Sequence, residues 1–128
     1  MRALLDTHAL LWYLAGERDL SARARDLIDD PGNTMVVSVA SLWEIAIKYG
    51  LGKLDLGLPF EDLVRDELSR TAFEILAIEV NHLITLSELP LHHRDPFDRL
   101  LIAQAISEDL PVVGTDSAFE RYPVGRIW

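Results

Sequence analysis

The chain contains no cysteine among its 128 residues. This absence excludes a disulfide framework and a metal site built on thiolates, and it suits the cytoplasmic location that we expect. No apolar run approaches the roughly 20 residues that a bilayer-spanning helix needs, and the N-terminus shows no basic, apolar and small-residue leader. We therefore expect no membrane segment. The length predicts one domain over residues 1–128.

Positive charge is also scarce. Twelve Lys and Arg residues stand against 21 Asp and Glu residues, so the formal net charge is −9. A protein that binds nucleic acid by broad neutralisation of phosphates is normally basic, and that mode of binding is excluded here. Either nucleic acid is not the substrate, or metal ions and a few local arginines make the contact. An acidic surface also suits a basic protein partner.

Apolar segments alternate between strand-like and helix-like patterns, without repeats or long linkers. Strands separated by helices favour an α/β fold with a mainly parallel sheet of four to five strands. The strands are expected over residues 2–5, 34–39, 73–78, 112–114 and 124–127. The helices are expected around Leu10 to Leu14, over 22–29 after the N-cap Ser21, from the N-cap Ser41 to Lys48, from Pro59, over 81–89 and over 97–108.

Four carboxylates stand where predicted strands end or predicted helices begin: Asp6, Glu44, Asp98 and Asp116. The carboxyl ends of parallel strands form one edge of the sheet, where ligands bind in α/β proteins. Four acids at this edge would repel one another unless a divalent cation held them together. The arrangement therefore predicts a magnesium or manganese site.

Each acid also has a purely structural interpretation. Asp6 and Asp116 can cap the helices that follow them. Glu44 can form an ion pair with Lys48 at i+4, which contributes only about 0.3–0.5 kcal/mol at a surface. The large apolar residues around Glu44 argue against a merely solvated position.

Asp95 and Asp98 compete for the third position of the set. Asp95 precedes a proline and is typical of a turn or cap residue. Asp98 lies in the first helical turn, where the helix dipole favours an anion. We prefer Asp98 as the ligand because Leu101, Ile102 and Ala105 place its helix face against the core.

Together these motifs resemble the PIN-domain nucleases, most closely the VapC-type toxins of bacterial toxin–antitoxin pairs. The matching stretches lie in the family's order along nearly the whole chain: 4–8 (LLDTH), 38–45 (SVASLWEI), 95–105 (DPFDRLLIAQA) and 113–116 (VGTD). The combination is more specific than any one stretch.

The resemblance implies a PIN-like three-layer α/β/α fold and metal-dependent cleavage of RNA. It implies one or two Mg²⁺ or Mn²⁺ ions, which would activate water and offset charge on the scissile phosphate. It also implies an inhibitory antitoxin whose C-terminal segment occupies the active-site groove. The residues that it assigns are the metal ligands Asp6, Glu44 and Asp98, the fourth acid Asp116, and the supporting residues Thr7 and Thr115.

Arginines and histidines near the acids are weaker candidates. Arg94 and Arg99 are candidates for contact with the RNA backbone, with surface solvation as the alternative. His8 adjoins Asp6, but its side chain should point away if the strand continues by one residue. His92 and His93 form a pair without further ligands, so we expect a solvated loop there rather than a metal site.

The acidic cluster also bears on the partner. A planar guanidinium can bridge two carboxylates, so we expect the antitoxin to insert a basic side chain from a basic C-terminal segment. Trp12, Tyr13 and the stretch 43–54 supply apolar residues that can join the core, a homodimer contact or an antitoxin surface. We expect a homodimer.

Two other functions stay open. A phosphatase-like hydrolase would use Asp6 as its nucleophile, but the haloacid-dehalogenase type carries a second Asp two residues later, where this chain has His8. A catalytically silent PIN-fold binding module would not need all four acids, which are present.

Overall fold

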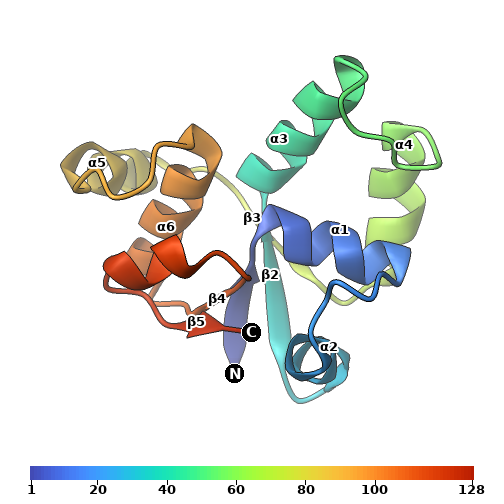
Figure 1. The fold of residues 1–128 in the computed structure, drawn as a ribbon, viewed down its shortest axis with the longest axis horizontal. Coiled ribbons are helices and arrows are strands. Elements are labelled where there is room, and N and C mark those ends of the chain that lie inside the picture. The colour runs from blue at the N-terminus through green and yellow to red at the C-terminus, as the bar shows by residue number, and fades with distance from the viewer.

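A computed structural model describes residues 1–128 as a five-stranded sheet with helices on both faces (Figure 1). All neighbouring strand pairs are parallel, and the strand order is β3-β2-β1-β4-β5. The strands are β1 (Arg2–Leu5), β2 (Thr34–Ser38), β3 (Glu74–Leu76), β4 (Val112–Val113) and β5 (Arg126–Ile127). The predicted α/β class with a parallel sheet is confirmed.

The helices make the two outer layers. In Figure 1, α1 and α2 lie on one side of the sheet and α5 and α6 on the other, which confirms the three-layer arrangement. None of the helices has the length and apolarity needed to cross a membrane. The helical elements are α1 (Thr7–Ala15), α2 (Ala22–Asp29), α3 (Val39–Gly50), α4 (Phe60–Asp62), η1 (Leu63–Glu67), η2 (Leu68–Arg70), α5 (Val80–Glu88), α6 (Pro96–Glu108) and η3 (Ser117–Arg121).

Alternate strand residues build separate cores on the two faces of the sheet. Ala3 and Leu5 of β1 belong to the core formed with α1 and α2. Leu4 and Val36 belong to the core that contains the apolar face of α6. Successive side chains of a strand point to opposite faces, so β1 and β2 are buried on both sides. The burial of β1 and β2 holds in place the strand ends after which Asp6 and the helix of Glu44 follow.

The boundary between β2 and α3 differs from the prediction. The helix begins at Val39, and its N-cap is Ser38, whose hydroxyl accepts a hydrogen bond from the Ala40 N–H at 3.0 Å. Ser41 lies inside the helix and is buried. Either serine can cap a helix, and the choice depends on where β2 stops pairing with β3, which is at Ser38.

Candidate metal centre

Asp6 lies between β1 and α1 and is only 4% exposed. Its Oδ1 accepts a hydrogen bond from the Ala9 N–H at 2.7 Å, so it caps α1 as one interpretation expected. Burial raises the pKa of Asp6 to about 7 despite this bond, and the charges of Asp116 and Glu44 add to the rise. The metal-free protein therefore holds this carboxylate in an unfavourable electrostatic environment.

Gly114 allows the end of β4 to approach Asp6. A Cβ atom on Gly114 would clash with Asp6 Oδ2, so a larger residue here would displace the Asp6 carboxylate. A glycine directly after a strand is a sign of such a close approach. Gly114 is a residue of the site that the four-acid pattern does not reveal, although its position directly after a strand is a signal for it.

Glu44 projects from α3 and is also 4% exposed. Its Oε2 accepts a hydrogen bond from Lys48 Nζ at 2.6 Å, so the i+4 ion pair is present. Its Oε1 is buried and has no hydrogen-bond partner. A buried charged oxygen without a partner costs roughly 1–3 kcal/mol or more, so Lys48 alone does not satisfy this carboxylate.

Asp95 and Asp98 have different roles at the start of α6. Asp95 is the N-cap, and its Oδ1 accepts hydrogen bonds from the N–H groups of Phe97 at 2.8 Å and Asp98 at 3.1 Å. Burial, followed by repulsion from Asp95, raises the pKa of Asp98 to about 6, with smaller contributions from Glu44 and Asp6. Asp98 therefore interacts electrostatically with the other acids, while the Asp95 carboxylate accepts hydrogen bonds from the first turn of α6.

Asp116 is the N-cap of η3. Its Oδ1 accepts a hydrogen bond from the Ala118 N–H at 2.9 Å, and its Oδ2 accepts one from His93 Nε2 at 2.8 Å. Burial would raise the pKa of Asp116, but these two donors outweigh it and the pKa lies below its usual value. Asp116 is thus an acid that the protein itself stabilises in the charged form.

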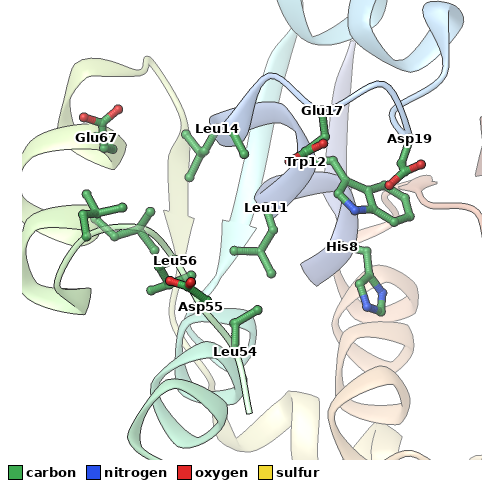
Figure 2. A pocket seen from close by; sticks show the side chains of 13 residues that line it. His8, Leu11, Trp12, Leu14, Glu17, Asp19, Leu54, Asp55, Leu56 and Glu67 are labelled. Atoms are coloured by element: carbon green, nitrogen blue, oxygen red, sulfur yellow. The ribbon is translucent and has the colours of Figure 1, made fainter. Parts of the chain in front are cut away.

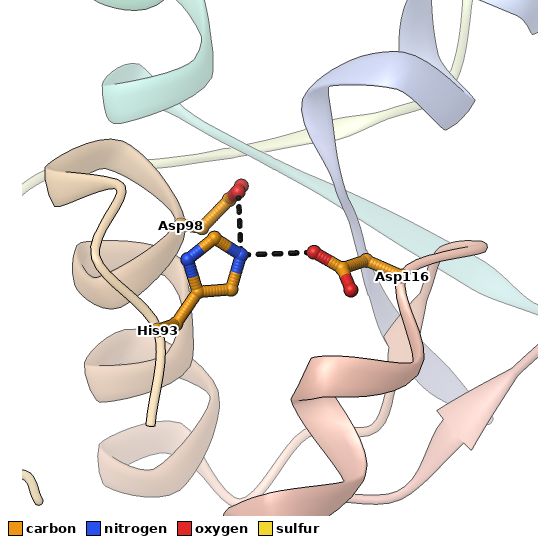
Figure 3. Close-up of side chains that lie close together, drawn as sticks. All are labelled: His93, Asp98 and Asp116. Atoms are coloured by element: carbon orange, nitrogen blue, oxygen red, sulfur yellow. Dashed lines mark hydrogen bonds and ion pairs between the residues drawn. The ribbon is translucent and has the colours of Figure 1, made fainter. Parts of the chain in front are cut away.

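His93 reaches the site, contrary to our expectation of a solvated histidine pair. One ring nitrogen of His93 and one oxygen each of Asp98 and Asp116 lie within 4.8 Å of one another (Figure 3). The expectation was wrong because the loop before α6 folds back, and the Tyr122 hydroxyl accepts hydrogen bonds from its backbone. His92 remains exposed.

The two supporting threonines differ. Thr7 is buried, and its hydroxyl donates to Ser41 Oγ at 3.0 Å, which connects the helix after Asp6 to the helix that carries Glu44. Thr115 is exposed, and its side chain makes no hydrogen bond within the protein. A supporting role for Thr115 stays a prediction.

The two arginines also differ. Arg99 donates to the carbonyl oxygens of Pro90 at 3.0 Å and Leu89 at 3.3 Å, so its guanidinium holds the loop before α6. Arg94 is exposed and forms no ion pair. Arg94 is therefore the freer of the two candidates for a phosphate contact, which remains a prediction for both.

His8 does not join the acids. It stacks on Trp12 with ring centroids 5.5 Å apart, and both line a pocket of about 450 Å³ between α1 and residues 54–58 (Figure 2). The expected orientation of His8 assumed that the strand continues by one residue, but a helix begins at Thr7 and β1 does not continue, so that reasoning does not apply.

The comparison with family models decides the classification. The model of the PIN domain matches residues 3–125. The chain belongs to the PIN-domain family. This PIN domain is 36% identical over 64 residues to Ribonuclease VapC16 of Mycobacterium tuberculosis, a match that covers 50% of the chain and 45% of that relative's length.

Solved structures share the fold of this PIN domain. VapBC2 of Rickettsia felis bound to a promoter DNA fragment matches with a TM-score of 0.73 and 21% identity, over 100% of this chain and 99% of the other. DNA-bound VapBC of Salmonella typhimurium matches with a TM-score of 0.73 and 20% identity, over 99% and 97%. FitAcB of Neisseria gonorrhoeae matches with a TM-score of 0.70 and 17% identity, over 100% and 97%.

The donor atoms of the site suit a hard divalent cation. They are carboxylate oxygens, which Mg²⁺ and Mn²⁺ prefer. The unpartnered Glu44 Oε1 and the raised pKa values of Asp6 and Asp98 are what a cation would relieve. The residues therefore fit a metal centre on charge and chemistry.

Proposed function

We propose that this PIN domain is a metal-dependent endoribonuclease that cleaves RNA phosphodiester bonds. One or two Mg²⁺ or Mn²⁺ ions would be held by Asp6, Glu44, Asp98 and Asp116. The observation that carries the proposal is the buried Oε1 of Glu44, which has no donor in a site shared with other carboxylates. The name of the relative, Ribonuclease VapC16, supports the choice of RNA.

The chemistry assigns separate tasks to the cation and to the side chains. A bound divalent ion would activate water and offset the negative charge of the scissile phosphate. Asp6 and Glu44 would fix the ion from the buried side, and the Thr7–Ser41 hydrogen bond keeps their helices in register. The ion supplies the positive field that a chain of net charge −9 lacks.

We infer further that the protein is the toxin of a toxin–antitoxin pair in the cytoplasm. Similar folds occur in VapBC2 of Rickettsia felis and in a toxin–antitoxin complex from Klebsiella pneumoniae. The partner would be an antitoxin whose basic C-terminal segment meets the acids. The pocket beside α1, which is lined by Leu11 and Trp12 among other apolar residues and by four acidic residues, offers a surface for the rest of the antitoxin. The toxin itself would be a homodimer.

Cleavage assays on partner-free protein test the proposal. Purified protein should cleave RNA with added Mg²⁺ or Mn²⁺, lose the activity in EDTA, and lose it in Asp6→Asn. Hydrolysis of a small phosphate monoester in place of RNA would favour the phosphatase-like alternative. Metal binding without turnover of either substrate would favour a silent binding module.

The partner is tested separately by competition. A co-purified antitoxin should bind less tightly when Mn²⁺ is added, and less tightly to the Asp6→Asn/Asp98→Asn double variant. Unchanged binding in both experiments would place the inhibitory contact away from the acids.

A further inference from the structure

We propose that His93 is a positioning residue that donates its Nε2 proton to Asp116 and keeps Asp98 beside it, and that it is not itself a metal ligand. The inference rests on the proposed metal-dependent function. The His93 imidazole lies beside the Asp98 and Asp116 carboxylates, and unlike them it can donate a hydrogen bond.

The hydrogen bond at the other ring nitrogen fixes the tautomer. His93 Nδ1 accepts a hydrogen bond from the Asp95 N–H at 3.1 Å. A nitrogen that accepts a hydrogen bond carries no proton, so the proton of the ring lies on Nε2. Nε2 is then a donor without a free lone pair, and a cation cannot coordinate it.

A metal-binding histidine has the opposite pattern. Such a histidine usually donates its second ring N–H to a carboxylate, carbonyl or water. Here the second nitrogen faces a backbone N–H, which would repel a proton on Nδ1. The cluster of His93, Asp98 and Asp116 thus has the spacing of a three-ligand site but not its hydrogen-bond pattern.

The contacts of Nε2 define what His93 orders. Nε2 lies 2.8 Å from Asp116 Oδ2 and 3.1 Å from Asp98 Oδ2, so one side chain bridges η3 and α6 (Figure 3). Asp98 Oδ1 makes no hydrogen bond and remains available to a cation. His93 therefore lies between the two outer carboxylates and orders them while leaving Asp98 Oδ1 free.

The backbone of His93 is itself held in place. The buried Tyr122 hydroxyl accepts hydrogen bonds from the N–H groups of His92 at 3.0 Å and His93 at 2.9 Å, and it donates to the Pro90 carbonyl at 2.9 Å. Asp116 and Tyr122 stand at the two ends of η3. Asp116 and Tyr122 thus hold the loop that carries His92 and His93 through the His93 side chain and through the backbone. A solvated surface loop would lack such contacts.

Nitrogen NMR of the wild-type protein tests the tautomer directly. With ¹⁵N-labelled histidine and no metal, His93 should show a protonated Nε2 and an unprotonated Nδ1. Saturating Mg²⁺ should leave this pattern unchanged. A shift of the proton to Nδ1 with loss of the Nε2 proton on adding Mg²⁺ would show that His93 is a ligand and would overturn the proposal.

Two substitutions separate a donor from a space-filling side chain. The amide of His93→Gln places an N–H near the position of Nε2, whereas that of His93→Asn reaches only the position of Nδ1. Calorimetry should show Mg²⁺ affinity about 10- to 100-fold weaker in His93→Asn, most of it recovered in His93→Gln. His92→Gln is the matched control and should bind Mg²⁺ as wild type does.

Equal losses in His93→Gln and His93→Asn would contradict the donor role. Failure of the proposed function is recognised separately, because wild-type protein would then neither bind Mg²⁺ nor cleave RNA. The metal-free tautomer of His93 can still be read in that case. It can also be read if either variant does not fold.

Discussion

The two inner acids, Asp6 and Glu44, differ from the two outer acids, Asp98 and Asp116, in how they are solvated and paired. Each inner acid is 4% exposed. The outer side chains are 25% and 42% exposed, and both lie within 3.1 Å of His93 Nε2. Inside the site, one oxygen of Glu44 is buried and has no hydrogen-bond donor within the protein.

This difference indicates which of the acids a bound cation would stabilise most. The more exposed Asp116 accepts hydrogen bonds from two N–H groups and its pKa is lowered, whereas burial raises the pKa of the less exposed Asp98 to about 6. On the buried side, the pKa of Asp6 is raised to about 7 because burial outweighs its single backbone donor. We therefore expect a divalent ion to matter most to the inner pair.

The largest expected effect is on cleavage when one acid of each pair is neutralised. Asp6→Asn and Asp98→Asn should each reduce metal-dependent cleavage by at least about 100-fold, the scale on which a single charge-stabilising group acts. Initial rates on a labelled RNA at saturating Mg²⁺ measure the loss. Asp26→Asn changes an exposed acid on α2 and serves as the control. Full activity in Asp98→Asn would move the third ligand to Asp95.

The second expected effect distinguishes a ligand from an ion-pair partner. Glu44→Gln should weaken Mg²⁺ binding about 10- to 100-fold, because it removes the negative charge of a buried carboxylate ligand. Lys48→Met removes only a cation beside the same carboxylate and should leave Mg²⁺ binding equal or tighter. Isothermal titration of both variants makes the comparison. Matching phenotypes would reduce Glu44 to a structural ion pair.

The third expected effect is on the stability of the metal-free protein. The pKa of Asp6 is raised from 3.8 to about 7 and that of Asp98 to about 6. Between about pH 4 and 7 the folded protein therefore binds more protons than the unfolded chain. The free energy of unfolding falls as the pH rises through this range. Neither acid contributes this destabilisation below about pH 4, because both are then protonated in both states.

Asp6→Asn tests this pH dependence. At about pH 8 in EDTA, the variant should be more stable than wild type by at least about 1 kcal/mol, of the order of one pKa unit. The gain should shrink towards about pH 4. Urea unfolding at both pH values measures the free energies, and Asp26→Asn is again the control. A gain that does not depend on pH would show that the negative charge of Asp6 does not destabilise the metal-free protein.

The smallest expected effect concerns Asp95, which caps α6 from outside the acid cluster. Asp95→Ala should lower the free energy of unfolding by about 1 kcal/mol, since two backbone N–H groups lose their acceptor. Asp95→Asn keeps a side-chain oxygen and should cost less. Thermal unfolding measures both. Loss of Mg²⁺ binding in Asp95→Asn with normal stability would make Asp95 a ligand instead of a cap.

Local sequence patterns were sufficient to predict the α/β class and the acids at the ends of strands and the starts of helices. Apolar runs such as residues 3–5 and 35–37 are buried, and caps such as Ser21 and Asp95 mark helix starts. These signals are local, because side-chain periodicity and capping depend on residues a few positions apart. From these signals the sequence predicts that the acids lie at one edge of a parallel sheet.

The exposure of each acid and its contacts depend on the three-dimensional packing of the elements and could not be predicted from the sequence. The His93–Asp116 bond, the approach of Gly114 to Asp6, and the Thr7–Ser41 bond join residues far apart in sequence. Burial of one Glu44 oxygen depends likewise on the packing of α3 beside α1 and α6. Composition and periodicity do not encode such distances, because they follow from the simultaneous packing of several elements.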